Sequence, residues 1–155
     1  MDRARGRELA AGGHSVSVRA ADVERLVAEA RAVRANAYAP YSRYRVGAAV
    51  MVRDGRIFTG CNVENATYGA TLCAERAAIA AMVAAGATAP VACAVVTAGA
   101  RPGAPCGICR QVFAEFAKDV RFVLVAEDKR GKIAARRSTR LSALLPQAFR
   151  LRDVR

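Results

Sequence analysis

The sequence contains no tryptophan, and aromatic side chains make up only 6% of its 155 residues. So few aromatics argue against a nucleic-acid platform, on which bases stack against such side chains. Alanine and valine instead supply much of the apolar fraction of 54%. We therefore expect one domain, because this length allows one core, with small residues packed between helices and a sheet.

Acidic residues are in deficit, which gives the chain a net charge of +12. The excess of positive charge lies at the two ends, because residues 46–128 contain equal numbers of acidic and basic side chains. Every motif that carries chemistry falls in this neutral middle. We interpret the charge as solvated basic ends and do not expect nucleic acid as a partner.

We expect neither a disulfide framework nor a secretion signal. The five cysteines are an odd number, and the first residues are charged and lead into no apolar signal-peptide core. A cytoplasmic, reducing setting fits both observations, and thiols there serve metal binding or catalysis more often than disulfides. Residues 77–100 carry no charge, but Gly86 and Pro90 interrupt them. We interpret this stretch as a buried helix, a turn and a buried strand, and expect no membrane association.

An α/β domain is expected over residues 21–150, between a flexible basic N-terminal extension (residues 1–20) and a basic C-terminal tail (residues 151–155). Hydrophobic periodicity separates helical from strand-like segments. We predict helices from residue 23 to before Pro40 and over residues 73–86, 106–118 and 141–145. Strands are predicted over residues 46–53, 56–62, 91–98, 121–126 and 132–136.

Two short links indicate how these strands pair. Asp54-Gly55 stands between two strand-like runs, which is a strong hairpin signal. Residues 127–131 are too few for a crossover between parallel strands. The last two strands are therefore predicted to be antiparallel.

Three cysteines have the spacing of metal ligands. Cys106 and Cys109 stand three residues apart at the start of a predicted helix, which suits two corners of a zinc tetrahedron. Cys73 opens another predicted helix and supplies a third sulfur. The sole histidine, His14, lies in the N-terminal extension, so a metal in the fold would have cysteine ligands.

A three-sulfur site leaves one corner open to water, which is typical of catalytic zinc, whereas structural sites are closed by four ligands. Glu75 lies two residues after Cys73, where it can carry protons for that water. Helix N-termini favour thiolates through their positive partial charge. We expect at least one of Arg76 and Arg110 to hydrogen-bond a ligand sulfur.

Two other interpretations of these cysteines remain open. One is a structural zinc site closed by Cys61 or Cys93, although only one close-spaced cysteine pair exists. The other is a free redox pair at Cys106 and Cys109, which would leave the motif around Cys73 unexplained.

Several segments extend the pattern around the cysteines. They are Tyr38-Ala-Pro-Tyr-Ser42, Val46-Gly-Ala-Ala49, Gly60-Cys-Asn-Val-Glu-Asn-Ala66, Cys73-Ala-Glu-Arg76 and Pro105-Cys-Gly-Ile-Cys-Arg-Gln111. A ligand-x-Glu motif followed by Pro-Cys-x-x-Cys is the pattern of zinc nucleobase deaminases, and together the segments resemble the small homotetrameric cytidine deaminases. The resemblance runs from about residue 23 to residue 149 and implies a three-layer α/β/α fold with a five-stranded mixed sheet.

The resemblance implies that Asn62 and Glu64, with Val63 between them, bind the ribose hydroxyls. The residues themselves agree, since side chains two apart on an extended segment face the same way. The alternative is that Asn62 and Glu64 only cap the turn before the next helix.

Three more residues acquire roles from the same resemblance. Ala66 is expected to approach the base through its backbone. Tyr44 stands where this family often has phenylalanine and is expected to pack against the nucleoside. Phe149 is expected to reach the active site of a neighbouring subunit.

The implied activity is zinc-dependent hydrolytic deamination of cytidine and 2′-deoxycytidine in pyrimidine salvage, with one Zn²⁺ per subunit and active sites shared within a homotetramer. Two related activities remain open: deamination of a modified cytosine nucleoside such as blasticidin S, or of cytosine in nucleic acid. Polynucleotide deaminases, by resemblance, carry a helix between the last two strands, and a linked 3′ oxygen suits Glu64 poorly. A non-enzymatic alternative is a zinc-stapled scaffold that binds polyanions.

Overall fold

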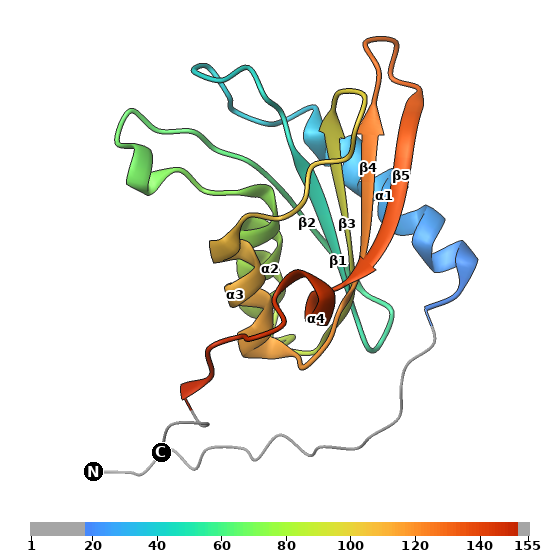
Figure 1. Ribbon diagram of the computed structural model, residues 1–155, viewed down its shortest axis with the longest axis vertical. Coiled ribbons are helices and arrows are strands. Elements are labelled where there is room, and N and C mark those ends of the chain that lie inside the picture. The colour runs from blue at the N-terminus through green and yellow to red at the C-terminus, as the bar shows by residue number, and fades with distance from the viewer. Residues whose placement is uncertain (1–17, 152–155) are drawn as a thin grey trace.

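The computed structural model describes residues 18–151, which form three layers (Figure 1). The predictions for residues 1–17 and 152–155, including those for His14, lie outside the described residues. The helices are α1 (Ala20–Arg34), α2 (Ala74–Ala84), α3 (Gly107–Phe116), α4 (Leu141–Leu144) and the 3₁₀ turn η1 (Tyr68–Ala70). The strands are β1 (Gly47–Val52), β2 (Ile57–Cys61), β3 (Pro90–Ala98), β4 (Arg121–Glu127) and β5 (Ile133–Arg140).

The strands form one mixed sheet in the order β2-β1-β3-β4-β5. β1 is antiparallel to both β2 and β3, so β2 and β3 run in the same direction, and β3 is parallel to β4. Since α2 follows β2 and α3 follows β3, both helices begin at the carboxyl ends of these strands. Their N-termini therefore meet at one end of the sheet, where α/β folds place their sites.

Each face of the sheet has its own apolar core. On one face α1 packs through Leu26 against small residues such as Ala94 and Val125. On the other face α2, α3 and α4 cover the sheet, and the rings of Phe113 and Phe122 meet edge-on with centroids 5.0 Å apart. The predicted three-layer fold with a core of small residues and a five-stranded sheet is confirmed.

The two predicted links are both observed. Asp54 accepts a hydrogen bond of 3.0 Å from the backbone of Arg56, and Gly55 has a φ of 88°, which completes the turn between β1 and β2. β5 returns antiparallel to β4, with Arg121 opposite Arg140. The charge-free stretch of residues 77–100 forms most of α2, a turn and β3. None of the helices in residues 18–151 is long and apolar enough to cross a bilayer.

The bounds of two elements differ from the prediction. α1 begins at Ala20, before the predicted start at residue 23, and ends at Arg34, well before Pro40. At its start the carboxylate of Asp22 accepts a 3.2 Å hydrogen bond from the backbone N–H of Arg19, which stabilises the first turn. β5 extends to Arg140 although most of its residues are exposed. Its length comes from pairing with buried β4, a tertiary effect that its polar sequence does not signal.

Candidate active site

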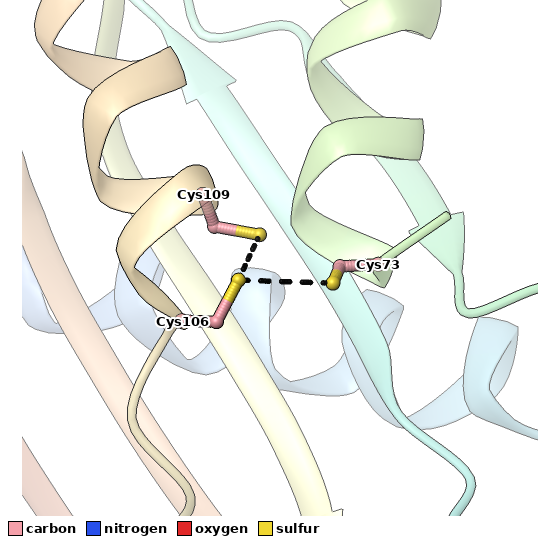
Figure 2. Close-up of side chains that lie close together, drawn as sticks. All are labelled: Cys73, Cys106 and Cys109. Atoms are coloured by element: carbon pink, nitrogen blue, oxygen red, sulfur yellow. Dashed lines mark hydrogen bonds between the residues drawn. The ribbon is translucent and has the colours of Figure 1, made fainter. Parts of the chain in front are cut away.

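Three sulfur atoms lie together where α2 and α3 begin (Figure 2). The Sγ of Cys106 is 3.9 Å from that of Cys73 and 3.5 Å from that of Cys109. All three sulfurs lie within 4.8 Å of one another. Cys73 and Cys106 are the N-cap residues of α2 and α3, and Cys109 lies in the first turn of α3.

This spacing fits a tetrahedral zinc ion. With zinc–sulfur bonds of about 2.3 Å, two sulfurs at tetrahedral corners are about 3.8 Å apart. The two measured separations, 3.5 and 3.9 Å, bracket that value. Cys106 is exposed and Cys73 is half-buried, so the cluster has a side open to solvent.

The thiols perturb one another strongly. Hydrogen bonding from the Cys109 thiol, followed by that from Cys106, lowers the pKa of Cys73 to about 5, and Arg76 contributes in the same direction. The same bond to Cys73, together with burial, raises the pKa of Cys109. A thiolate at Cys73 therefore opposes the deprotonation of Cys109, whereas a divalent cation would balance several thiolates.

Arg76 lies close enough to Cys73 to help lower the pKa of that thiol. One of its terminal nitrogens donates a 2.6 Å hydrogen bond to the carbonyl of Thr71. Its buried Nε has no hydrogen-bond partner among the described residues. An unpaired buried donor is costly, so this N–H group suits a negatively charged acceptor such as a metal-bound thiolate at Cys73.

Within the described residues, the hydrogen bonds of Arg110 go to backbone carbonyls, so the expectation that at least one of the two arginines bonds a sulfur rests on Arg76. The guanidinium of Arg110 donates to the carbonyl of Pro105 at 2.7 Å and to that of Leu144 at 2.9 Å. It therefore ties the residue before Cys106 to the end of α4. Arg110 follows Cys109 in sequence, but successive helix residues point in different directions.

Glu75 is buried at 5% exposure in the first turn of α2. Burial raises the pKa of its carboxyl group, and the neighbouring Cys73 adds to the rise. A raised pKa brings a carboxyl group closer to the pH at which an enzyme works, which favours both accepting and releasing a proton. This is the property that proton transfer requires.

No fourth side chain joins the sulfurs within residues 18–151. Cys93 is fully buried in the core beneath α2, and burial raises the pKa of its thiol. Cys61 is half-buried at the end of β2. The described residues therefore offer an open three-sulfur site and no closed four-cysteine site.

Residues 62–64 lie beside two other segments, the loop that follows α1 and the loop that leads to Cys73. Val63 and Leu72 form an antiparallel bridge, and Tyr38 bonds the backbone on either side of Val63. Leu72 directly precedes Cys73, so this bridge brings the backbone of Asn62 and Glu64 close to the backbone of Cys73.

Asn62 is 8% exposed and its amide is bonded to one stretch of backbone. Its Oδ1 accepts from the N–H of Val46 at 2.8 Å, and its Nδ2 donates to the carbonyl of Tyr44 at 2.9 Å. A primary amide has two N–H donors, so one donor of Asn62 remains for a ligand.

The carboxylate of Glu64 accepts three hydrogen bonds. The N–H groups of Tyr41 and Ser42 donate at 2.8 and 3.2 Å, and the Ser42 hydroxyl donates to the other oxygen. These bonds, the Ser42 hydroxyl first, lower the pKa of Glu64. A carboxylate accepts about four bonds, so capacity for one more remains. A cavity of 450 Å³ lies beside it, lined by Tyr41, Ser42, Glu64, Asn65, Tyr68 and Thr71.

The sequence model of the cytidine and deoxycytidylate deaminase zinc-binding region matches residues 20–126. The chain belongs to this family. It is 44% identical to a cytidine deaminase of Sporosarcina psychrophila over 133 residues, which cover 86% of this chain and 95% of the relative. The family confirms the predicted enzyme, a hydrolase, and with the cysteine cluster it confirms the predicted zinc cofactor.

Solved structures of the family share the fold. The cytidine deaminase of Burkholderia pseudomallei is 46% identical and superimposes with a TM-score of 0.72, covering 81% of this chain and 98% of that one. The cytidine deaminase of Mycobacterium tuberculosis is 42% identical with a TM-score of 0.69, covering 84% and 98%. The fold inferred from the family resemblance is thereby confirmed.

The remaining predicted residues of this family member are more exposed. Val63 is 44% exposed, and Ala66 is exposed in the bend before η1. The hydroxyl of Tyr44 lies against Gly103, where an added Cβ would come within 2.8 Å of it. Phe149 is 62% exposed, and its carbonyl accepts a 2.7 Å bond from Gln111.

The sequence did not identify two residues, Ser42 and Thr97, that hold loops around the site in place. Ser42 was noted only as part of a motif, although its hydroxyl bonds Glu64. Thr97 is buried, and its hydroxyl donates to Val125 at 3.3 Å while accepting from the N–H of Gly103 at 3.3 Å. Thr97 thus anchors the loop that leads to Cys106. No local sequence pattern identifies Thr97, because Val125 is distant in sequence and Gly103 lies in a loop.

Proposed function

We propose that the protein catalyses the hydrolytic deamination of cytidine and 2′-deoxycytidine to uridine and 2′-deoxyuridine, with release of ammonia. The observation that carries this proposal is the grouping of three sulfurs with the buried carboxyl of Glu75 at the joined N-termini of α2 and α3. Pyrimidine salvage in the cytoplasm is the corresponding setting, and five unpaired cysteines suit that reducing environment.

In this proposal Cys73, Cys106 and Cys109 hold one zinc ion per subunit. Zinc with an open position lowers the pKa of a bound water from about 16 to about 7. The two helix N-termini each contribute roughly half a unit of positive charge, which offsets the negative charge of the thiolates. Arg76 adds a full positive charge on the same side.

Glu75 carries the protons. It takes a proton from the attacking water and delivers it to the ring nitrogen next to the reacting carbon. It then transfers the second proton of the water to the amino group, which leaves as ammonia. The new carbonyl oxygen comes from the water, so one carboxyl group serves both transfers and ends as it began.

Asn62 and Glu64 select the sugar. The free N–H of Asn62 donates a hydrogen bond to one ribose hydroxyl, and the carboxylate of Glu64 accepts a hydrogen bond from another. A carboxylate at this place favours a free hydroxyl and disfavours a phosphodiester, which carries negative charge. A nucleoside is therefore the substrate, and a polynucleotide is not.

The exposed residues of the site belong to a shared active site in a homotetramer. Tyr44 and the backbone of Ala66 pack against the nucleoside, and Phe149 reaches a neighbouring subunit. The support is their exposure: Tyr44 and Phe149 lie open to solvent in the single chain, where a second copy could cover them.

One assay tests this proposal against its relatives. Purified protein with measured zinc content is incubated with cytidine, 2′-deoxycytidine, blasticidin S and single-stranded DNA, and loss of the amino group is followed. Turnover of the two simple nucleosides supports the proposal. Turnover confined to blasticidin S or to DNA would overturn it, as would a zinc-loaded protein with no turnover.

A further inference from the structure

The two sugar-binding side chains share one support. Asn62 bonds the backbone of Tyr44 and Val46, and Glu64 bonds the backbone of Tyr41 and Ser42. All four partners belong to residues 41–46, here called the 41–46 segment. The positions of both sugar contacts therefore depend on how firmly this segment is held.

The back of the 41–46 segment is held by α1. Successive carbonyls of an extended chain point to opposite sides. The carbonyl of Tyr44 faces Asn62, whereas that of Arg45 accepts a 2.9 Å hydrogen bond from the Nε of Arg34. The Arg45 side chain returns a 3.4 Å bond to the carbonyl of Ala35.

Arg34 is itself held by a buried carboxylate. Its terminal nitrogen lies 2.5 Å from an oxygen of Glu127, whose side chain is 7% exposed. Arg31 bonds the other oxygen of Glu127 and also donates to the carbonyl of Gly131 at 2.8 Å. Both oxygens of Glu127 are thus occupied by α1, and the guanidinium of Arg34 is fixed in one orientation.

Close packing makes this support stiff. Gly47 follows the 41–46 segment directly, and a Cβ at that position would lie 2.1 Å from the carbonyl oxygen of Ala30 and 2.8 Å from the Cβ of Arg34. Backbone of β1 therefore touches backbone of α1. A segment gripped this closely cannot shift without moving the helix.

We propose that Arg34, oriented by Glu127, is a positioning residue for nucleoside recognition: it holds the 41–46 segment so that Asn62 and Glu64 meet the ribose hydroxyls. The inference rests on the proposed function. Arg34 touches no reacting atom, so its effect should fall on KM and on substrates that have these hydroxyls.

The test compares two arginines that share one carboxylate. Arg34→Gln removes one bond to Glu127 and the bond to the carbonyl of Arg45. Arg31→Gln removes the other bond to Glu127 but no bond to the 41–46 segment. KM and kcat are measured for cytidine and for 2′,3′-dideoxycytidine, together with zinc content and thermal unfolding. Arg34→Lys is a third variant, which keeps a positive charge near Glu127 but loses the Nε donor.

Arg34→Gln should raise KM for cytidine roughly threefold to tenfold, as expected for a weakened hydrogen bond, with a smaller change in kcat. KM for dideoxycytidine should not change, because that substrate lacks both hydroxyls. Arg31→Gln should lower the unfolding temperature similarly but leave both KM values unchanged. Arg34→Lys should restore the unfolding temperature but should not restore the KM for cytidine.

Equal KM changes for the two substrates, equal changes in Arg34→Gln and Arg31→Gln, or restoration of KM by Arg34→Lys would each overturn the inference alone. A wild-type protein that binds zinc but does not turn over cytidine would overturn the proposed function and this inference with it. Cytidine turnover in the wild type therefore separates the two failures.

Discussion

Val63 and Leu72 bond each other reciprocally, each N–H donating to the other's carbonyl at 2.9 Å. Glu64 follows one member of this bridge and Cys73 follows the other. The bridge therefore fixes how far the backbone that carries the Glu64 carboxylate lies from the backbone that carries the sulfur of Cys73. Proximity and orientation of this kind account for a large part of enzymatic rate enhancement.

Replacing Glu75 with glutamine should lower kcat on cytidine by at least about a thousandfold, because an amide cannot relay protons. Zinc content should stay near that of the wild type, since Glu75 is not among the clustered sulfur donors. Steady-state kinetics and metal analysis of the same preparation check this. Glu115→Gln, at an exposed position of α3, is the control and should be fully active. A Glu75→Gln variant with wild-type kcat would refute the proton-carrier role.

Replacing Cys106 with alanine should remove zinc and lower the unfolding temperature, because metal affinity contributes directly to folded-state stability. Cys61→Ala is the matched control, as Cys61 is a free cysteine outside the cluster. It should keep its zinc. Zinc loss from Cys61→Ala would instead indicate a fourth sulfur ligand and a closed structural site.

The sequence allowed the fold and the three sulfurs to be predicted because their signals are local. Asp54-Gly55 encodes its turn within two residues, and Cys106 and Cys109 are separated by less than one helical turn. Link lengths indicated two antiparallel strand pairs, and the family resemblance supplied the five-stranded mixed sheet. Cys73 could be added because it, too, opens a helix.

What could not be predicted depends on long-range contacts. Arg34 and Glu127 are far apart in sequence, and neither belongs to a motif, so their pairing is visible only in the fold. Arg110 stands beside a predicted ligand yet bonds the carbonyls of Pro105 and Leu144. Where a long side chain points is decided by acceptors that other segments bring within reach.

Ser42→Ala should change the pH dependence of KM. The Ser42 hydroxyl is the largest of the contacts that hold the pKa of Glu64 below its ordinary value of 4.5. The carboxylate is therefore present above that value and is lost only as pH falls through the lowered pKa. Without the hydroxyl the pKa moves back up, so KM for cytidine should begin to rise at a higher pH.

Kinetics at pH values from about 7 down to about 4 measure this shift. Ser42→Thr keeps a hydroxyl and should follow the wild-type profile more closely than Ser42→Ala. Superimposable KM profiles for the wild type and Ser42→Ala would show that Glu64 does not contact the substrate.

Gly60→Ala should destabilise the protein by more than an ordinary surface change, by about 1–3 kcal/mol or more. A Cβ at Gly60 would lie 2.4 Å from the nitrogen of Ala78 and 2.5 Å from the carbonyl oxygen of Ala74, so backbone of α2 would have to move away from β2. Gly69→Ala is the control, since an added Cβ there meets nothing within 4 Å. Urea unfolding of both variants measures the difference.

The same substitution should also reach the active site. Ala74 lies between Cys73 and Glu75, so a displaced α2 N-terminus shifts a sulfur ligand and the proton carrier together. Gly60→Ala should therefore lose zinc more readily to a chelator and have a lower kcat than Gly69→Ala, under conditions where both variants are folded. If Gly60→Ala matched Gly69→Ala in stability, zinc retention and kcat, the tight contact between β2 and α2 would not be what places Cys73 and Glu75.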